Sequence, residues 1–256
     1  MAQTLPASNP AAEAVLSRLD QVRDGGLVVD LACGVGQPSL LLAARRPALS
    51  VVGIDLTQAM LDRATELAEA NGLGNARFQH GSLDSLPMDD AAADAVISQF
   101  GFLQEGDVHL SITEAVRILK PGGVLSVVAF DDMALNTLMS TMEAAFTGIA
   151  NDELLPDFSY LTALALPGDR EDRLRSAGMR TVASELVRWE VPLPDVEVLW
   201  SLALAPAPFG RASTSLTQAE LSAVEERLVD LSAAFRTPDG GRLVFPMACR
   251  AFWGTK

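Results

Sequence analysis

The sequence is poor in basic residues. Its 19 Lys and Arg stand against 33 Asp and Glu, which gives a formal net charge of −14 and a pI near 4.5. Proteins that bind DNA or RNA build their affinity on Lys and Arg side chains that neutralise phosphates. The charge balance therefore argues against nucleic acid as a partner of this chain.

Cysteines and long apolar runs are also scarce. Cys33 and Cys249 lie far apart and belong to no CxxC or Cys/His cluster, so we expect neither a disulfide nor a metal site. No apolar run approaches the roughly 20 residues that span a bilayer. Residues 1–16 lack the basic start and continuous apolar core of a signal peptide. We expect a cytoplasmic protein with no membrane partner.

The hydrophobic pattern is that of an α/β protein. Hydrophobic residues make up 49% of the 256 residues, enough to build a core for one domain. After a helix over residues 10–22, short apolar runs alternate with amphipathic stretches, which predicts a parallel sheet with crossover helices. Strands are expected near 27–32, 51–55, 76–79, 94–99 and 123–130, and helices near 38–45, 57–71, 107–119 and 133–149.

The pattern loosens after residue 150. Helices are expected near 170–177, 194–204 and 216–235, and strands near 181–191 and 242–253. The two late strands predict a hairpin that extends the sheet. We therefore expect a Rossmann-like, seven-stranded, mostly parallel sheet with one antiparallel strand from the C-terminal hairpin, helices on both faces and a helical lid. The expected organisation is an N-terminal helix within residues 1–26 and one domain over 27–256, with lid insertions near 133–160 and 192–241.

A glycine-rich turn comes after the first strand, and Asp55 ends the second strand. This arrangement is typical of a nucleoside-binding crevice. The run from Gly34 to Ser39 lacks the third glycine of the dinucleotide fingerprint GxGxxG, and Asp30 would repel a pyrophosphate. The pattern favours an adenosine ligand with a positive centre and no phosphate, such as S-adenosylmethionine, with Asp55 on the ribose hydroxyls. An NAD(P)-binding oxidoreductase is the alternative, based on the crevice and Asp55.

Four segments in this order carry a family resemblance. They are VVDLACGVGQPSL (28–40), GIDLTQAML (53–61), FQHGSLDSLPMDDAAADAVISQFGF (78–102) and LKPGGVLSVVAF (119–130). Together they resemble the class I S-adenosylmethionine-dependent methyltransferases of the UbiE/COQ5-like, small-molecule type (methyltransferase type 11). The resemblance is strong over residues 27–130 and looser over 164–256.

The resemblance implies a cofactor and its binding residues. The cofactor is S-adenosylmethionine, the product is S-adenosylhomocysteine, and no metal is expected. Asp55 is expected on the ribose. The residues implied for the methionine part, the adenine and the reaction centre are, in chain order, Asp30, Ala32, Cys33, Gly34, Gly36, Gln37, Leu56, Met60, Gly81, Ser82, Leu83, Ser98, Gln99 and Phe100.

The methyl acceptor is constrained mainly by the residues at the end of the fourth expected strand. Ser98–Gly101 lacks the (D/N)PP(Y/F) signature of amino-nitrogen methylation and the carboxylate of metal-dependent catechol methylation. We expect a small, apolar acceptor, methylated on oxygen, nitrogen or carbon. A base is needed only when the acceptor must lose a proton, and the candidates are His109, Asp131 and Tyr160. A protein that binds the cofactor without transferring methyl is a further alternative, and a homodimer is compatible with the sequence.

Overall fold

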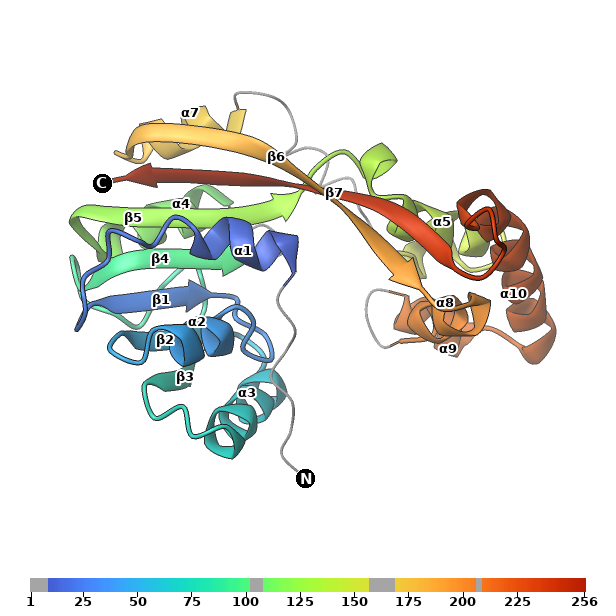
Figure 1. The fold of residues 1–256 in the computed structure, drawn as a ribbon, viewed down its shortest axis with the longest axis horizontal. Coiled ribbons are helices and arrows are strands. Elements are labelled where there is room, and N and C mark those ends of the chain that lie inside the picture. Colours follow the sequence, from blue (N-terminus) through green and yellow to red (C-terminus); the bar gives the residue numbers. More distant parts are fainter. Residues whose placement is uncertain (1–8, 102–107, 157–168, 206–208) are drawn as a thin grey trace. The chain divides into compact units, whose positions relative to one another are not determined.

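A seven-stranded sheet organises the chain in the computed structural model, which describes residues 9–101, 108–156, 169–205 and 209–256 (Figure 1). The strand order is β3-β2-β1-β4-β5-β7-β6. Strands β1 to β5 run parallel, and β7 pairs antiparallel with β5. The predicted fold class is confirmed. The strands are β1 (Leu27–Leu31), β2 (Ser50–Asp55), β3 (Ala76–His80), β4 (Ala93–Gln99), β5 (Leu119–Phe130), β6 (Arg180–Leu193) and β7 (Leu243–Thr255).

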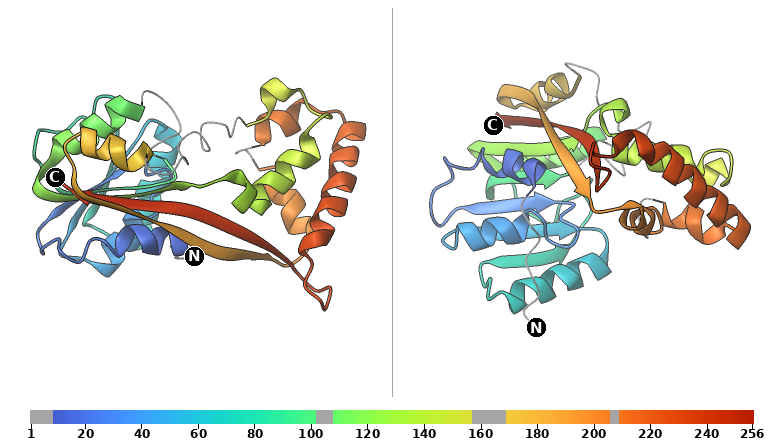
Figure 2. Two further views of the ribbon diagram at one scale, coloured as in Figure 1. Left: turned by 90° about the horizontal axis from the view of Figure 1, so that it is seen from above. Right: turned by 45° about the vertical axis from the view of Figure 1, so that its right-hand side comes forward.

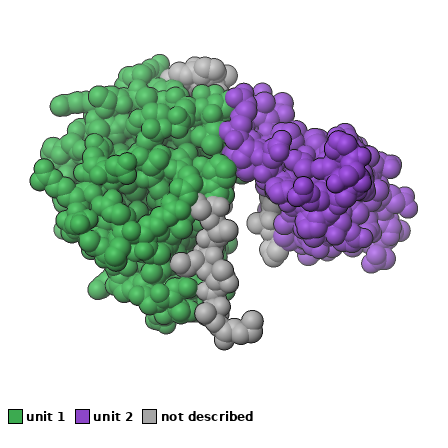
Figure 3. Space-filling view, viewed as in Figure 1, with its two compact units in different colours: residues 1–130, 163–187, 249–256 green, residues 131–162, 188–248 purple. Residues whose placement is uncertain are grey.

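The chain divides into two compact units (Figure 3). The first unit comprises residues 1–130, 163–187 and 249–256, and the second comprises 131–162 and 188–248. Strands β6 and β7 contribute residues to both units. The first unit contains the carboxyl ends of β1 to β4, where ligands bind in open α/β sheets. That the second unit acts as a lid stays a prediction.

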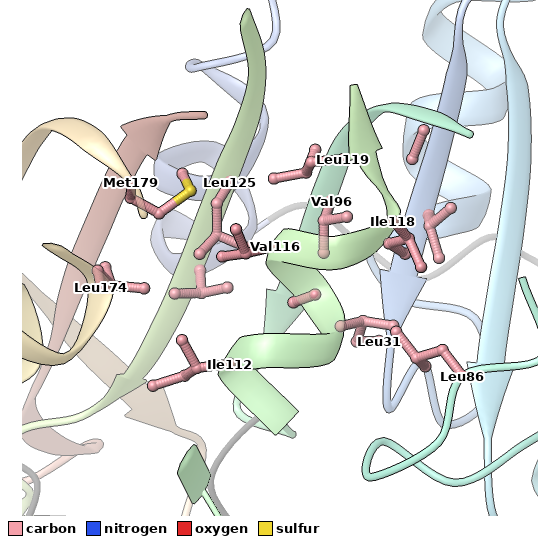
Figure 4. Packing of buried hydrophobic residues seen from close by; sticks show 14 of the residues in the cluster. Leu31, Leu86, Val96, Ile112, Val116, Ile118, Leu119, Leu125, Leu174 and Met179 are labelled. Atoms are coloured by element: carbon pink, nitrogen blue, oxygen red, sulfur yellow. The ribbon is translucent and has the colours of Figure 1, made fainter. Parts of the chain in front are cut away.

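Helices cover both faces of the sheet in the first unit. Figure 2 shows α1 on one face and α4 with α7 on the other. On the α4 face, Ile112, Val116 and Ile118 belong to one buried cluster with residues of the strands, Leu174 and Met179 (Figure 4). The helices of this unit are α1 (Pro10–Leu16), α2 (Ser39–Arg45), α3 (Gln58–Ala70), α4 (Val108–Ile118) and α7 (Asp169–Ser176).

The second unit is mainly helical. Helix α10 packs on α5 and α8, and the rings of Phe146 and Phe209 stack with centroids 5.3 Å apart. Arg227 donates from Nη1 to the carbonyl oxygen of Thr147 at 2.7 Å. Its elements are η1 (Met133–Leu135), α5 (Thr137–Phe146), η2 (Asp152–Leu154), α8 (Val196–Ala203), α9 (Gly210–Ser215), α10 (Gln218–Ser232) and η3 (Ala233–Phe235).

The N-terminal helix is shorter than expected. It begins after the Asn9 cap and ends at Leu16, whereas the sequence predicts a helix to residue 22. Beyond Leu16 the chain continues in short turns, in which the N–H of Leu19 binds the carbonyl of Leu16 and that of Val22 binds the carbonyl of Leu19. These turns bury Leu19 and Val22, so packing rather than helix periodicity fixes this segment.

A second difference concerns the turn before the fifth strand. The sequence predicts a helix near 107–119 and a strand near 123–130, which leaves Pro121 and Gly122 between them, but both residues lie within the bounds of β5, which begins directly after α4. The pairing of β4 with β5 is irregular there, because Ala93 pairs with Leu119 and Ala95 with Val124. The turn therefore becomes an interruption of the strand.

Within the described part of the chain, no helix is long and apolar enough to cross a membrane.

Candidate functional site

A cavity of about 520 Å³ lies in the first unit, at the carboxyl ends of β1, β2, β3 and β4. Its size falls within the range of about 300–1,000 Å³ that is usual for small-molecule sites. The ends of these strands and the segments that follow them supply its lining. The lining residues are Ala32, Gly34, Asp55, Leu56, Thr57, Met60, Gly81, Ser82, Leu83, Asp84, Gln99, Phe100 and Gly101.

The glycine-rich turn after β1 is a tight backbone loop. The N–H of Gly36 binds the carbonyl of Cys33 at 2.9 Å, and Gly34 and Gly36 have positive φ angles of 52° and 94°. A β-carbon at Gly36 would lie 2.9 Å from the side chain of Leu40 and 3.2 Å from that of Ala64. Glycine is therefore required where the turn passes between α2 and α3. The loop brings the backbone of Gly34 to the cavity wall.

Asp55 holds this loop from the end of β2. Its Oδ2 accepts the N–H of Gly34 at 2.8 Å, and its Oδ1 accepts the N–H of Thr57 at 2.9 Å. The carboxylate thus joins the loop after β1 to the start of α3 while lining the cavity. Each carboxylate oxygen offers two lone pairs, so both oxygens retain capacity to accept hydrogen bonds from a ligand's hydroxyls.

Asp30 lies beneath the loop and is fully buried. Its Oδ2 accepts the hydroxyl of Ser39 at 2.6 Å, whereas its Oδ1 has no hydrogen-bond partner among the described residues. Burial raises the pKa of Asp30 to about 7, partly offset by hydrogen bonds from Ser39, and the nearby charge of Asp55 raises it further. A cationic group brought near this carboxylate would stabilise its ionised form.

The end of β4 meets the glycine-rich loop closely. Phe100 has a positive φ of 61° and its ring stacks on that of Phe130, at a centroid distance of 4.3 Å. A β-carbon at Gly101 would lie only 2.3 Å from that of Ala32, so no side chain fits there. Gln99 donates to Oδ1 of Asn9 at 3.4 Å, and its buried Oε1 has no partner among the described residues. This edge of the cavity combines an aromatic wall with one unsatisfied acceptor.

Leu56 and Met60 present apolar surface at the cavity. Their exposed fractions are 55% and 42%, which is high for large apolar side chains. Leu83 lines the cavity from the loop after β3, where the N–H of Gly81 binds the carbonyl of Asp55 at 3.0 Å. Apolar side chains left exposed around a cavity are typical of a ligand site.

The charge of the cavity lining is entirely negative. Asp55 and Asp84 are the ionisable side chains that line it, and no Lys or Arg does so among the described residues. Residues 1–8, 102–107, 157–168 and 206–208, which lie outside the described part, contain no Lys or Arg in the sequence. A phosphate group would meet carboxylates without a compensating cation, so the lining suits a neutral or cationic ligand. The described residues also contain no group of three or more His, Cys, Asp or Glu placed to hold a metal ion.

The structure brings ten of the fifteen predicted cofactor residues together at the cavity. Those that line it are Ala32, Gly34, Asp55, Leu56, Met60, Gly81, Ser82, Leu83, Gln99 and Phe100. Asp30, Cys33, Gly36, Gln37 and Ser98 lie outside the lining set. Ser98 is buried and its hydroxyl donates to the carbonyl of Leu31 at 2.7 Å. Cys33 is also buried, and burial raises the pKa of its thiol, so it packs as a neutral side chain.

Three lining residues were not predicted: Thr57, Asp84 and Gly101. Each lies two to five residues beyond the carboxyl end of a predicted strand, and that position is the signal that would have found them.

None of the three candidate bases is among the described residues that line this cavity. Asp131 is buried in the second unit and accepts the N–H of Asp132 at 2.8 Å. His109 lies on α4, but its side chain is not described, and Tyr160 lies outside the described residues. All three stay predictions.

Comparison with known proteins agrees with this geometry. A methyltransferase domain family matches residues 28–123. A trans-aconitate 2-methyltransferase of Variovorax paradoxus is 31% identical over 243 residues, which cover 93% of this chain and 90% of that protein. A demethylmenaquinone methyltransferase of Thermus thermophilus is 42% identical over 103 residues, covering 40% of this chain and 46% of that protein, so the matched part spans less than half of this relative.

Solved structures agree on the fold. The YcgJ protein of Bacillus subtilis superposes with a TM-score of 0.61 over 96% of this chain and 97% of that protein, at 18% identity. The resemblance carried by the four ordered segments is confirmed by the full-length match to the Variovorax protein. The chain belongs to the class I S-adenosylmethionine-dependent methyltransferase family.

Proposed function

We propose that this chain transfers a methyl group from S-adenosylmethionine to a small organic acceptor. The observation that carries the proposal is the cavity at the carboxyl ends of β1 to β4, with Asp55 in its wall and no basic side chain among its described lining residues. An adenosine with a sulfonium and an ammonium group is the ligand that such a wall suits.

The residues of the cavity fit the parts of this cofactor. Asp55 would accept hydrogen bonds from the ribose hydroxyls, and Leu56 and Met60 would pack against the purine. Gln99, which lines the cavity at the end of β4, would lie beside the methionine part of the cofactor. Asp30 would act from beneath the loop, since it does not line the cavity, and its carboxylate would favour that positive charge through space.

When bound, S-adenosylmethionine supplies an electrophilic methyl group on a sulfonium centre. The protein's task is then to hold both reactants in line and to exclude water. The ring of Phe100, which lines the cavity and stacks on Phe130 behind it, would provide an apolar wall next to the reacting region, and the close contact of Gly101 with Ala32 would fix the position of that wall. Where the acceptor must lose a proton, His109, Asp131 and Tyr160 are the proposed bases.

The acceptor is proposed to be small and apolar. The aromatic wall and the negatively charged lining support a neutral molecule over an anion. The name of the Variovorax relative indicates an anionic acceptor, trans-aconitate, which makes that molecule a useful counter-example. Binding and transfer are therefore best tested with acceptors that differ in charge.

A two-stage experiment tests this function. Calorimetry with S-adenosylhomocysteine and with NADH is followed by transfer of a labelled methyl group to a hydroquinone, a secondary amine and trans-aconitate. We expect S-adenosylhomocysteine to bind, NADH not to bind, and label to appear on the hydroquinone. Cofactor binding without label on any acceptor would favour a non-transferring protein, and tight NADH binding alone would favour the oxidoreductase alternative.

A further inference from the structure

The side chain of Gln99 joins the cavity wall to the N-terminal helix. Gln99 ends β4 and lines the cavity, and its Nε2 donates to Oδ1 of Asn9 at 3.4 Å. Both residues are half-buried, although 90 positions separate them in the sequence. The proposed function places Gln99 beside the cofactor but gives no role to Asn9. What Asn9 does at the edge of a ligand cavity follows from how its side chain is held.

Asn9 is held in place by the helix that it caps. Its Oδ1 accepts the N–H of Ala12 at 2.8 Å, and its carbonyl oxygen accepts the N–H of Glu13 at 3.0 Å. An N-cap side chain of this kind satisfies an N–H group that has no partner within the helix. The Oδ1 atom that Gln99 contacts is therefore fixed by α1 and does not depend on Gln99 for its position.

Helix α1 is in turn fixed on the sheet. It packs on β4 and β5, with Ala12 and Val15 fully buried (Figure 1). The hydroxyl of Ser126 on β5 donates to the carbonyl oxygen of Val15 at 2.9 Å. Both Nη atoms of Arg45 on α2 donate to the carboxylate of Glu13, at 2.8 and 2.6 Å. These contacts do not involve Asn9, so they keep α1 in place when the side chain of Asn9 is shortened.

An acceptor that is fixed in this way selects one end of the Gln99 amide. A glutamine side chain donates from Nε2 and accepts at Oε1, so Oδ1 of Asn9 holds the Nε2 end. The side chain also has three rotatable bonds, and a partner on α1 restricts them before any ligand binds. Because the side chain is already ordered, ligand binding does not have to order it, and this favours affinity.

We propose that Asn9 is a positioning residue for the cofactor and acts by holding Gln99 against the cavity wall. This inference rests on the proposed function, because that function puts the methionine part of the cofactor beside Gln99. Asn9 itself is outside the cavity lining, so it acts only through Gln99. Its loss therefore weakens ligands that carry the amino-acid part and leaves ligands without that part unaffected. The contact is long for a hydrogen bond between two amides, so the effect is modest.

The experiment compares S-adenosylhomocysteine with 5′-methylthioadenosine, which lacks the amino-acid part, by calorimetry on the full chain. Asn9→Ser keeps a side chain that caps the helix, but that side chain is one bond shorter and withdraws from Gln99. We expect Asn9→Ser to bind S-adenosylhomocysteine about threefold to tenfold more weakly, the range for ordering one long side chain, and methylthioadenosine with unchanged affinity. Asn9→Asp keeps both the cap and the acceptor and should bind S-adenosylhomocysteine at least as tightly as the wild type.

Asn151→Ser is the matched control. Asn151 caps η2, where its Oδ1 accepts the N–H of Glu153 at 3.0 Å, and it is outside the cavity lining. The same substitution at this cap should leave both affinities unchanged. Gln99→Met removes the amide that Asn9 holds. In that background Asn9→Ser should cause no further loss of affinity for S-adenosylhomocysteine, whatever the affinity for methylthioadenosine.

The outcomes separate this role from the proposed function. If S-adenosylhomocysteine binds the wild type and Asn9→Ser equally well, or if Asn9→Ser weakens both ligands alike, the role of Asn9 is wrong and the proposed function stands. An undiminished loss in the Gln99→Met background would overturn that role in the same way. If S-adenosylhomocysteine does not bind the wild type, the proposed function fails and this inference fails with it. Thermal unfolding checks that Asn9→Ser is folded, and Asn9→Thr, which also caps without reaching Gln99, repeats the test if it is not.

Discussion

At the scale of single residues, Asp55 links the local backbone to the ligand site. The same carboxylate anchors Gly34 and Thr57 through their N–H groups and faces the cavity. Its removal therefore costs both the preformed loop and the proposed contact to the ribose. Structure and binding depend here on one side chain.

We predict that Asp55→Ala weakens binding of S-adenosylhomocysteine by about 1–3 kcal/mol, the range for a polar group left without its hydrogen-bond partner in a buried site. Calorimetry measures the change. Asp62→Asn on α3 is the control, because Asp62 is exposed and outside the cavity lining, and its side chain accepts the side-chain amide of Gln58. Equal affinities for the wild type and Asp55→Ala would contradict the ribose assignment.

Asp30 makes the stability of the folded protein depend on pH. Its pKa is raised from 3.8 to about 7, chiefly by burial, so between these values the folded protein holds a proton that the unfolded chain has released. Its contribution to stability is therefore complete below about pH 4, falls as the pH rises through 7, and stays low above that. The full loss is on the order of a few kcal/mol.

We predict that Asp30→Asn flattens this dependence, because an amide does not ionise. Urea unfolding of both proteins at pH 5 and pH 8 gives the free energy of unfolding at each pH. Carboxylates whose pKa is lowered, such as Asp94 and Glu114, make the free energy of unfolding depend on pH in the opposite direction. Their contribution is the same in both proteins, so it cancels when the free energy of the variant is subtracted from that of the wild type. An identical pH dependence in both proteins would contradict the burial argument.

At the scale of elements, the loops after β1 and β4 depend on each other. Gly101 passes so close to Ala32 that their β-carbons would be 2.3 Å apart, and Ala32 itself has a positive φ of 53°. Ala32 therefore occupies a backbone conformation that glycine adopts more easily. The cavity wall at this point is set by a contact between two loops that follow neighbouring strands.

We predict that Gly101→Ala destabilises the protein by about 1–3 kcal/mol, as overpacking usually does, and weakens binding of S-adenosylhomocysteine. Adding Ala32→Gly removes one of the two clashing β-carbons and should recover part of both losses. The carbonyl oxygen of Ala32, 2.8 Å from the added carbon, prevents full recovery. Additive effects in a double-mutant cycle, measured by urea unfolding and calorimetry, would show that the loops are not coupled.

The elements that the sequence predicted well are those with a strong local signal. Runs such as Val28–Leu31, which is apolar except for Asp30, and Val51–Ile54 are rich in apolar residues because both faces of a parallel strand are buried. Helix α9 was missed because Gly210–Ser215 holds weak helix formers and no apolar periodicity.

The candidate site was predicted only as far as its motifs reach. The motifs led to the lining residues Ala32, Gly34 and Asp55, whereas Asp84 and Gly101 carry only the weaker signal of following a predicted strand, and the close contact of Gly101 with Ala32 appears only in the fold. The burial of Asp30 beneath the loop has the same origin, since α2 brings Ser39 over it. Long-range packing of this kind leaves no periodic trace in the sequence.

At the scale of the whole molecule, the charge and the fold lead to the same class of ligand. The net charge of −14 and the cavity without basic lining residues, in the part described, disfavour phosphate-bearing ligands. The first unit holds this cavity, and the second unit, residues 131–162 and 188–248, contains Asp131.

Calorimetric titration of the full chain with S-adenosylhomocysteine, with NADH as the comparison ligand, tests the central claim most directly. The account predicts saturable binding of S-adenosylhomocysteine that is weakened by Asp55→Ala, and no heat with NADH. Saturable binding of NADH together with no heat from S-adenosylhomocysteine would contradict it.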